Sequence, residues 1–150
     1  MIGKKALVPN PALKHFEVLI GDWENTGRHP ALPGTELHGR TSFEWHEGGA
    51  FVIMHSQIEH KDFPDGVAIF GSDNDAKSIY MIYFDERGIS RKYDVSLKGK
   101  KLKWERIDPK FSQRFTMTFS TDGRKIIGKG EMSQKQGSWE HDLSLTMTRV

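Results

Sequence analysis

From Gly21 to the end of the chain, apolar and polar residues alternate with a period of two. Turn residues interrupt this alternation about every 8–12 positions, which is typical of an all-β sandwich or barrel. Examples are Pro33-Gly34, Pro64-Asp65-Gly66, Glu86-Arg87-Gly88 and Asp122-Gly123. Because sequential strands usually lie next to one another, we expect an antiparallel up-and-down meander of about ten strands. Closing this meander into a barrel removes its exposed edges.

The segment before Gly21 has a different pattern. Asn10-Pro11 favours a helix start, because Asn caps free backbone N–H groups and Pro is tolerated in the first turn. We expect a short helix that covers one open end of the barrel, preceded by a flexible arm over residues 1–9. Residues 10–150 are expected to form a single domain, since a chain of 150 residues has the commonest size for one core.

The two ends of the strand-rich region indicate how the barrel closes. Leu19-Ile20-Gly21-Asp22-Trp23 opens it, and an alternating strand from Trp139 to Arg149 ends it. We expect Trp23 to plug one end of the barrel, with Arg149 lying across its ring. Such a cation–π contact is worth about 0.5–2 kcal/mol.

Strand alternation also predicts which side chains face the interior. In the final strand one face carries Trp139, His141, Leu143, Leu145, Met147 and Arg149. The same test leaves a mostly apolar interior with a few polar side chains, which is the usual composition of a ligand pocket. The polar residues that we expect to contact a ligand are Arg91, Tyr93, Arg106, Gln113 and His141.

Two further features of the interior follow from the alternation. In the strand around His55 one face carries Phe51, Ile53, His55 and Gln57, but Val52, Met54 and Ile58 on the other face are also apolar, so its register stays open. Gly128 and Gly130 both face inward, and inward glycines often mark a bend or a close approach to the backbone.

Composition and charge narrow the function classes. Lys and Arg number 22 against 20 Asp and Glu, and a net charge of +2 gives no reason to expect nucleic acid or an acidic membrane as partner. The chain has no cysteine, which excludes disulfides and thiolate metal sites, and no apolar run long enough to span a bilayer. We expect a soluble, cytoplasmic protein. The sequence also lacks a G-x-S-x-G nucleophile elbow and the paired histidines of common zinc sites.

Several stretches together resemble a bacterial family of lipocalin-like domains of unknown function. They are Leu19 to Trp23, Ser42 to Phe51, Gly66 to Asp73, Tyr80 to Gly88 and Leu145 to Arg149. The resemblance implies a calycin-type barrel and no established activity. The chain is more distantly similar to nitrobindin-like haem barrels, which open with G-x-W and ligate haem through a His on the last strand. That resemblance implies His141 as the matching position, although Glu24 to Pro30 replaces the glycine-rich, tyrosine-containing strand of those proteins.

Four hypotheses follow. The preferred hypothesis is a barrel that binds a small hydrophobic molecule and no cofactor. The acidic head of this molecule would lie near Arg91, Arg106 and Tyr93. The alternatives are a haem protein with His141 as axial ligand, an enzyme with His141 or Glu131 as base, and a barrel filled by its own side chains. We expect no nucleic-acid or membrane partner, and a homodimer stays open.

Overall fold

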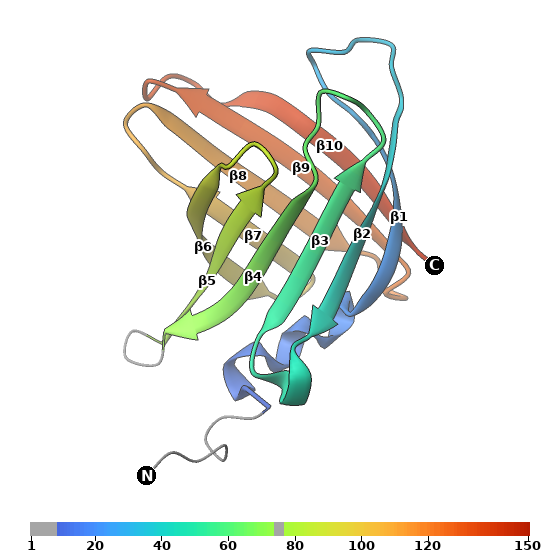
Figure 1. Cartoon of the computed structure of the whole chain (residues 1–150), viewed down its shortest axis with the longest axis vertical. Helices are drawn as coiled ribbons and strands as arrows, with labels where there is room; N and C mark the ends of the chain where they lie inside the picture. Colours follow the sequence, from blue (N-terminus) through green and yellow to red (C-terminus); the bar gives the residue numbers. More distant parts are fainter. Residues whose placement is uncertain (1–8, 74–76) are drawn as a thin grey trace.

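The computed structural model describes residues 9–73 and 77–150. Within these residues, ten strands form one closed antiparallel barrel in which sequence neighbours pair and β1 pairs with β10 (Figure 1). The predicted up-and-down barrel is therefore confirmed, whereas most of the predicted arm, residues 1–8, lies outside the described residues. The strands are β1 (Gly21–Arg28), β2 (Leu37–Trp45), β3 (Val52–Ile58), β4 (Gly66–Asp73), β5 (Ser78–Asp85), β6 (Ser90–Lys98), β7 (Lys101–Arg106), β8 (Phe111–Phe119), β9 (Lys125–Gln134) and β10 (Glu140–Arg149).

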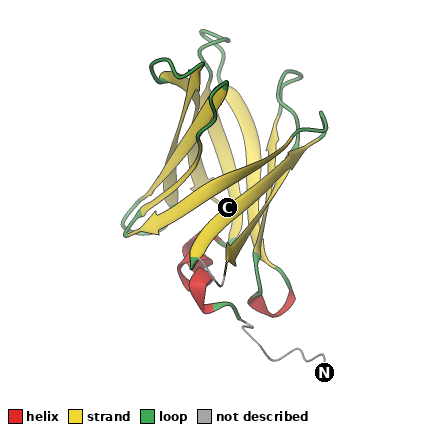
Figure 2. Ribbon diagram, turned by 90° about the vertical axis from the view of Figure 1, so that its left-hand side faces the viewer, coloured by secondary structure: helices red, strands yellow, loops and turns green. Residues whose placement is uncertain are grey.

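The predicted N-terminal helix is the 3₁₀-helix η1 (Pro11–Leu19), which lies across one end of the barrel (Figure 2). The Asn10 side chain caps it by accepting a hydrogen bond from the backbone N–H of Ala12 at 3.0 Å. Phe16 is fully buried and its ring centroid lies 5.3 Å from that of Phe70 on β4. A second short helix, η2 (Glu47–Gly49), connects β2 to β3 at the same end. This end of the barrel is consequently closed by apolar packing.

Trp23 and Arg149 tie the helix to the barrel wall. The Trp23 ring is 1% exposed, and the Arg149 guanidinium lies 4.2 Å from its centroid. Arg149 also donates hydrogen bonds of 2.6 and 2.7 Å to the backbone carbonyls of Val18 and Ile20. The Trp23 indole N–H donates to the Leu19 carbonyl at 2.8 Å. The last strand thereby holds the end of η1 over the barrel floor.

Turns border the other end of the barrel, which we call the open end because none of the described residues forms a helix there (Figure 2). An up-and-down meander places alternate turns at opposite ends, so the turns at the open end are those that follow the odd-numbered strands. They comprise residues 29–36, 59–65, 86–89, 107–110 and 135–139. None of the helices in the described part of the chain has the length and apolar character needed to cross a bilayer.

An irregularity in β10 changes which side chains face inward. The pairing of β10 with β9 shifts between His141 and Ser144. A bulge of this kind breaks the strict alternation of faces. Asp142 consequently lines the interior and His141 is exposed, so the prediction that His141 faces inward is wrong.

The structure also shows which face of β3 points into the barrel. Val52 and Met54 are buried, whereas 53% of the His55 side chain is exposed beside Glu44 on the outer face. The alternative that placed Ile53 and His55 on the inner face is therefore wrong, whereas Phe51, which precedes β3, does pack against the buried core. The side chains of β3 that line the interior are Met54, Ser56 and Ile58, with Gln57 joining them near the strand's end.

Candidate ligand-binding site

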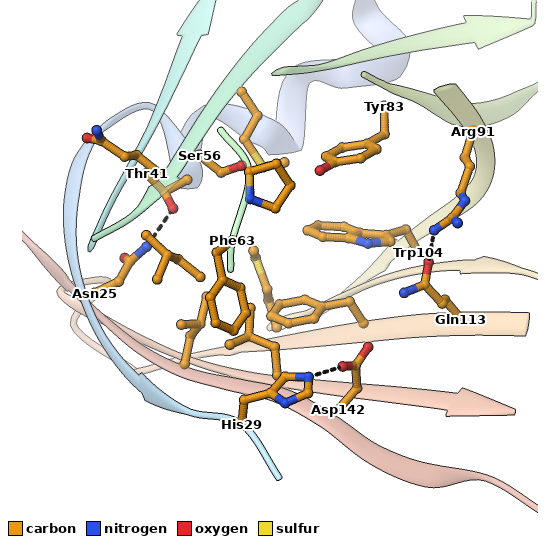
Figure 3. Close-up of a pocket in the computed structure, with 18 of the residues that line it drawn as sticks. Asn25, His29, Thr41, Ser56, Phe63, Tyr83, Arg91, Trp104, Gln113 and Asp142 are labelled. Carbon is orange, nitrogen blue, oxygen red and sulfur yellow. Dashed lines mark hydrogen bonds and ion pairs between the residues drawn. The ribbon is translucent and has the colours of Figure 1, made fainter. Parts of the chain in front are cut away.

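A cavity of about 570 Å³ occupies the barrel between its floor and its open end. Ligand pockets usually measure roughly 300–1,000 Å³ and are lined mainly by apolar and aromatic side chains. The barrel is thus not filled by its own residues, contrary to the last of the four hypotheses. Its apolar lining includes Phe63, Met81, Tyr83, Trp104, Phe115 and Leu145. Figure 3 labels Phe63, Tyr83 and Trp104 of this set.

One wall of the cavity is a stacked aromatic pair. The rings of Trp104 on β7 and Phe115 on β8 have centroids 5.1 Å apart and planes 16° apart. A Cβ atom on Gly128 of β9 would lie only 2.7 Å from Cζ of Phe115. The inward glycine therefore leaves room for a ring, and the close approach expected at Gly128 is made by Phe115 itself.

Three of the predicted ligand-binding residues meet in this cavity. Arg91 and Tyr93 come from β6 and Gln113 from β8, and all three line the cavity. Figure 3 shows Arg91 and Gln113 with the hydrogen bond between them. The side-chain oxygen of Gln113 accepts a hydrogen bond of 2.8 Å from Arg91 and another of 2.8 Å from the Tyr93 hydroxyl. Burial raises the pKa of Tyr93, so its hydroxyl stays protonated and remains a donor. Two donors thus converge on one acceptor position.

The arginines around the cavity differ in how their charge is balanced. Arg87 forms an ion pair of 2.7 Å with Asp85, and Arg114 forms one of 2.9 Å with Glu131. The Arg114 guanidinium also lowers the pKa of Glu131. Over residues 9–73 and 77–150, Arg91 has no carboxylate within ion-pair distance. Its hydrogen-bonded partner is the neutral amide of Gln113, and its guanidinium lies 5.4 Å from the ring centroid of Phe111.

Arg106 does not join this group. Its guanidinium turns back to the β7–β8 turn, 3.4 Å from the Phe111 carbonyl and 3.6 Å from an Asp108 carboxylate oxygen. It is absent from the cavity lining. The alternation of β7 gave the correct side of the strand for Leu102 and Trp104, but the long Arg106 side chain pairs within its own hairpin.

His141 lies outside the barrel cavity. Together with Arg28 and Ser144 it lines a smaller pocket beside the turn that follows β1. An iron atom bound by His141 would consequently lie outside the barrel cavity.

Three polar residues of the cavity, Asn25, Thr41 and Ser56, were not predicted from the sequence, and they lie on the adjacent strands β1, β2 and β3. Asn25 of β1 is 4% exposed, and its side-chain N–H donates a 2.7 Å hydrogen bond to the Thr41 hydroxyl on β2. Ser56 of β3 pairs in register with Thr41 and also lines the cavity. The signal for Asn25 was available, because it follows the inward Trp23 by two residues.

His29 and Asp142 form a hydrogen-bonded pair at the entrance of the cavity. Nε2 of His29 lies 2.8 Å from the Asp142 carboxylate, and its Nδ1 accepts a 3.0 Å hydrogen bond from the Ala31 N–H. The ring meets Phe63 edge-on with centroids 5.7 Å apart. Because both ring nitrogens are engaged, the pair fastens the β1–β2 turn to β10. In the described ranges, no three His, Asp or Glu side chains are grouped to hold a metal ion.

Comparisons with known proteins identify the class of fold. No protein-family model matches the chain, and a search of curated proteins gives no match either. Among solved structures, the crystal structure of Rv2717c from M. tuberculosis matches with a TM-score of 0.66 and 15% identity, over 93% of this chain and 98% of that one. Zebrafish ileal bile acid-binding protein, complexed with cholic acid, matches with a TM-score of 0.54 and 17% identity, over 89% of this chain and 99% of that one. These likenesses show a calycin-like barrel, and the family resemblances noted in the sequence stay predictions.

Proposed function

We propose that this protein binds a small hydrophobic molecule with an anionic head, which Arg91 and Tyr93 hold near the open end of the barrel. The observation that carries the proposal is a guanidinium without a carboxylate partner in the described structure, set in the wall of a 570 Å³ apolar cavity. A cation in such surroundings gains most from an anion that replaces the water it has lost.

The hydrogen bonds to Gln113 indicate where an anionic oxygen would bind. A guanidinium has five N–H donors in a fixed fork, and Gln113 takes a hydrogen bond from one of the Arg91 nitrogens. A carboxylate meets such a fork with two parallel hydrogen bonds. The Tyr93 hydroxyl donates its single O–H to the same Gln113 oxygen, and a bound anionic oxygen would take the place of Gln113 as the acceptor of this hydrogen bond.

The remainder of the cavity suits an apolar body. The stacked Trp104 and Phe115 rings offer a flat aromatic wall, and Met81 and Leu145 add flexible aliphatic surface. The likeness to the zebrafish protein supports this use of the fold, since that barrel was crystallised with cholic acid. Burial of the ligand's apolar surface would contribute roughly 25 cal/mol per Å² before the costs of association.

The test is a fluorescence titration with cis-parinaric acid, a polyene fatty acid that brightens when it leaves water. We expect a saturable one-to-one increase in emission, followed by displacement of the probe when palmitic acid is added. An emission increase that never saturates, or one that palmitic acid does not reverse, would contradict the proposal.

A further inference from the structure

Asn25 carries a polar atom that the protein leaves without a partner. The residue is 4% exposed and lines the cavity, and its Nδ2 donates to the Thr41 hydroxyl at 2.7 Å. Its side-chain oxygen has no hydrogen-bond partner among the residues that the structure describes. A buried polar atom without a partner is costly, typically about 1–3 kcal/mol.

The strands beside Asn25 provide no free hydrogen-bond partner for its side-chain oxygen. Asn25 sits within β1 between β10 and β2, whose backbone N–H and C=O groups are used by the strand ladders on both sides. Thr41 supplies a single hydroxyl. If the Asn25 amide turns over, its oxygen accepts from Thr41 and its NH₂ group becomes the unpartnered atom instead. Either orientation leaves one polar atom of Asn25 without a partner in the wall of the cavity.

Asn25 and Thr41, which we call the polar wall, lie across the cavity from Arg91 and Tyr93, the proposed anion site. In the closed ring of strands β6 stands halfway round from β1, and β8 stands halfway round from β3. Asn25 and Thr41 therefore face Arg91 and Gln113 across the aromatic middle (Figure 3).

The two polar groups also differ in depth. Arg91 is the second residue of β6 and Thr41 is the fifth residue of β2, and both strands begin at the open end. A molecule with its head on Arg91 would thus extend its other end downward, to the opposite wall.

We infer that the ligand is an amphipathic acid that carries a hydroxyl group remote from its anionic head, and that Asn25 and Thr41 bind this hydroxyl. The inference rests on the proposed function and adds the ligand class. A hydroxyl both donates and accepts, so it satisfies the Asn25 amide in either orientation. Ser56, which neighbours Thr41 in register, provides a further hydroxyl on the same wall. A purely aliphatic tail would leave the Asn25 atom unpartnered in a dry cavity.

The experiment compares matched acids that differ in one hydroxyl. Lauric, myristic and palmitic acids and their ω-hydroxylated counterparts displace cis-parinaric acid from the wild-type protein, and three chain lengths cover the unknown span between head and tail. We expect at least one length at which the hydroxylated acid binds about tenfold more tightly than its parent. Equal affinities at every length would overturn the inference while leaving the proposed function in place.

Variants then assign the preference to the polar wall. Asn25→Leu should abolish or reverse it, and Thr41→Val, which keeps the side-chain shape, should reduce it even if the first variant folds poorly. Thr26→Val is the matched control, because Thr26 lies on the outer face of β1. Arg91→Met should weaken both acids of a pair equally and keep their ratio. A preference that survives Asn25→Leu and Thr41→Val would overturn the inference, and failure of every acid to bind would overturn the proposed function with it.

Discussion

The guanidinium of Arg91 donates a 2.8 Å hydrogen bond to the side-chain oxygen of Gln113, so this cation is held by a neutral amide. Arg87 and Arg114, which also line the cavity, are instead balanced by the carboxylates of Asp85 and Glu131. This contrast is the reason for proposing that Arg91 binds an anion from outside the chain.

A Gln113→Glu substitution tests this relationship with almost no change of shape. The new carboxylate would form an ion pair with Arg91 and neutralise its charge. The affinity for cis-parinaric acid should therefore fall about tenfold or more. The neutral methyl ester should bind as it does to the wild type. Competition titrations with acid and ester measure both, and an equal loss for the two would show that the substitution acts through shape alone.

Arg149 should contribute to stability and not to binding. Arg149→Met removes the contact with the Trp23 ring and the bonds to the Val18 and Ile20 carbonyls, and we expect it to lower the free energy of unfolding by about 2–4 kcal/mol. Arg149→Lys keeps the charge but lacks the fork, so it should recover only part of the loss. Urea unfolding provides the measurement, and a change below about 0.5 kcal/mol would contradict this role.

Gly128 should be needed for the shape of the aromatic wall. Gly128→Ala places a Cβ atom 2.7 Å from Phe115 and pushes that ring toward the cavity. We expect a loss of about 1–3 kcal/mol in stability together with weaker binding of cis-parinaric acid. Lys129→Ala, at an exposed position on the same strand, is the control. Wild-type affinity in the Gly128→Ala variant would mean that the ring does not border the bound molecule.

Asp85 should give the fold a specific acid sensitivity. Its hydrogen bonds with Arg87 lower the carboxyl pKa from 3.8 to about 2. The folded protein therefore holds the ionised form more strongly than the unfolded chain does, and this stabilisation is complete above pH 3.8 and lost as the pH falls toward about 2. Asp85→Asn should flatten the pH dependence of the unfolding free energy in this interval. Urea titrations at several pH values measure it, and an unchanged slope would contradict the assignment.

His141 should be dispensable for any binding inside the barrel. The side chain is exposed beyond the β10 bulge, so His141→Ala should leave the affinity for cis-parinaric acid unchanged. The same variant decides the haem alternative. A Soret shift on haem addition that disappears in His141→Ala would establish a haem site outside the barrel cavity.

The fold and part of the site could be predicted from the sequence because alternation is a strong signal in a barrel with one dry face. Arg91, Tyr93 and Gln113 lie on undisturbed strands, and counting by two places all three inside. Arg106 shows the limit of this method. Alternation sets the direction of the Cα–Cβ bond, but a long flexible side chain is free to turn back to its own hairpin.

The remaining differences have local causes. The β10 bulge shifts the alternation of inward and outward side chains by one residue, so Asp142 faces the interior in place of His141. No turn residue marks this bulge in the sequence. In β3 both faces are apolar, so His55 could not be placed by pattern alone. Asn25 could have been found by counting from Trp23, but its unpartnered oxygen depends on contacts between strands that are distant in sequence.

The affinities of Arg91→Met for cis-parinaric acid and for its methyl ester test most directly whether Arg91 binds an anionic head. Arg124→Met, which removes the same charge at an exposed position near the closed end, is the matched control. We predict that Arg91→Met binds the acid about tenfold or more weakly and binds the ester like the wild type, and that Arg124→Met changes neither affinity. If Arg91→Met binds the acid as tightly as the wild type, Arg91 does not hold an anionic head.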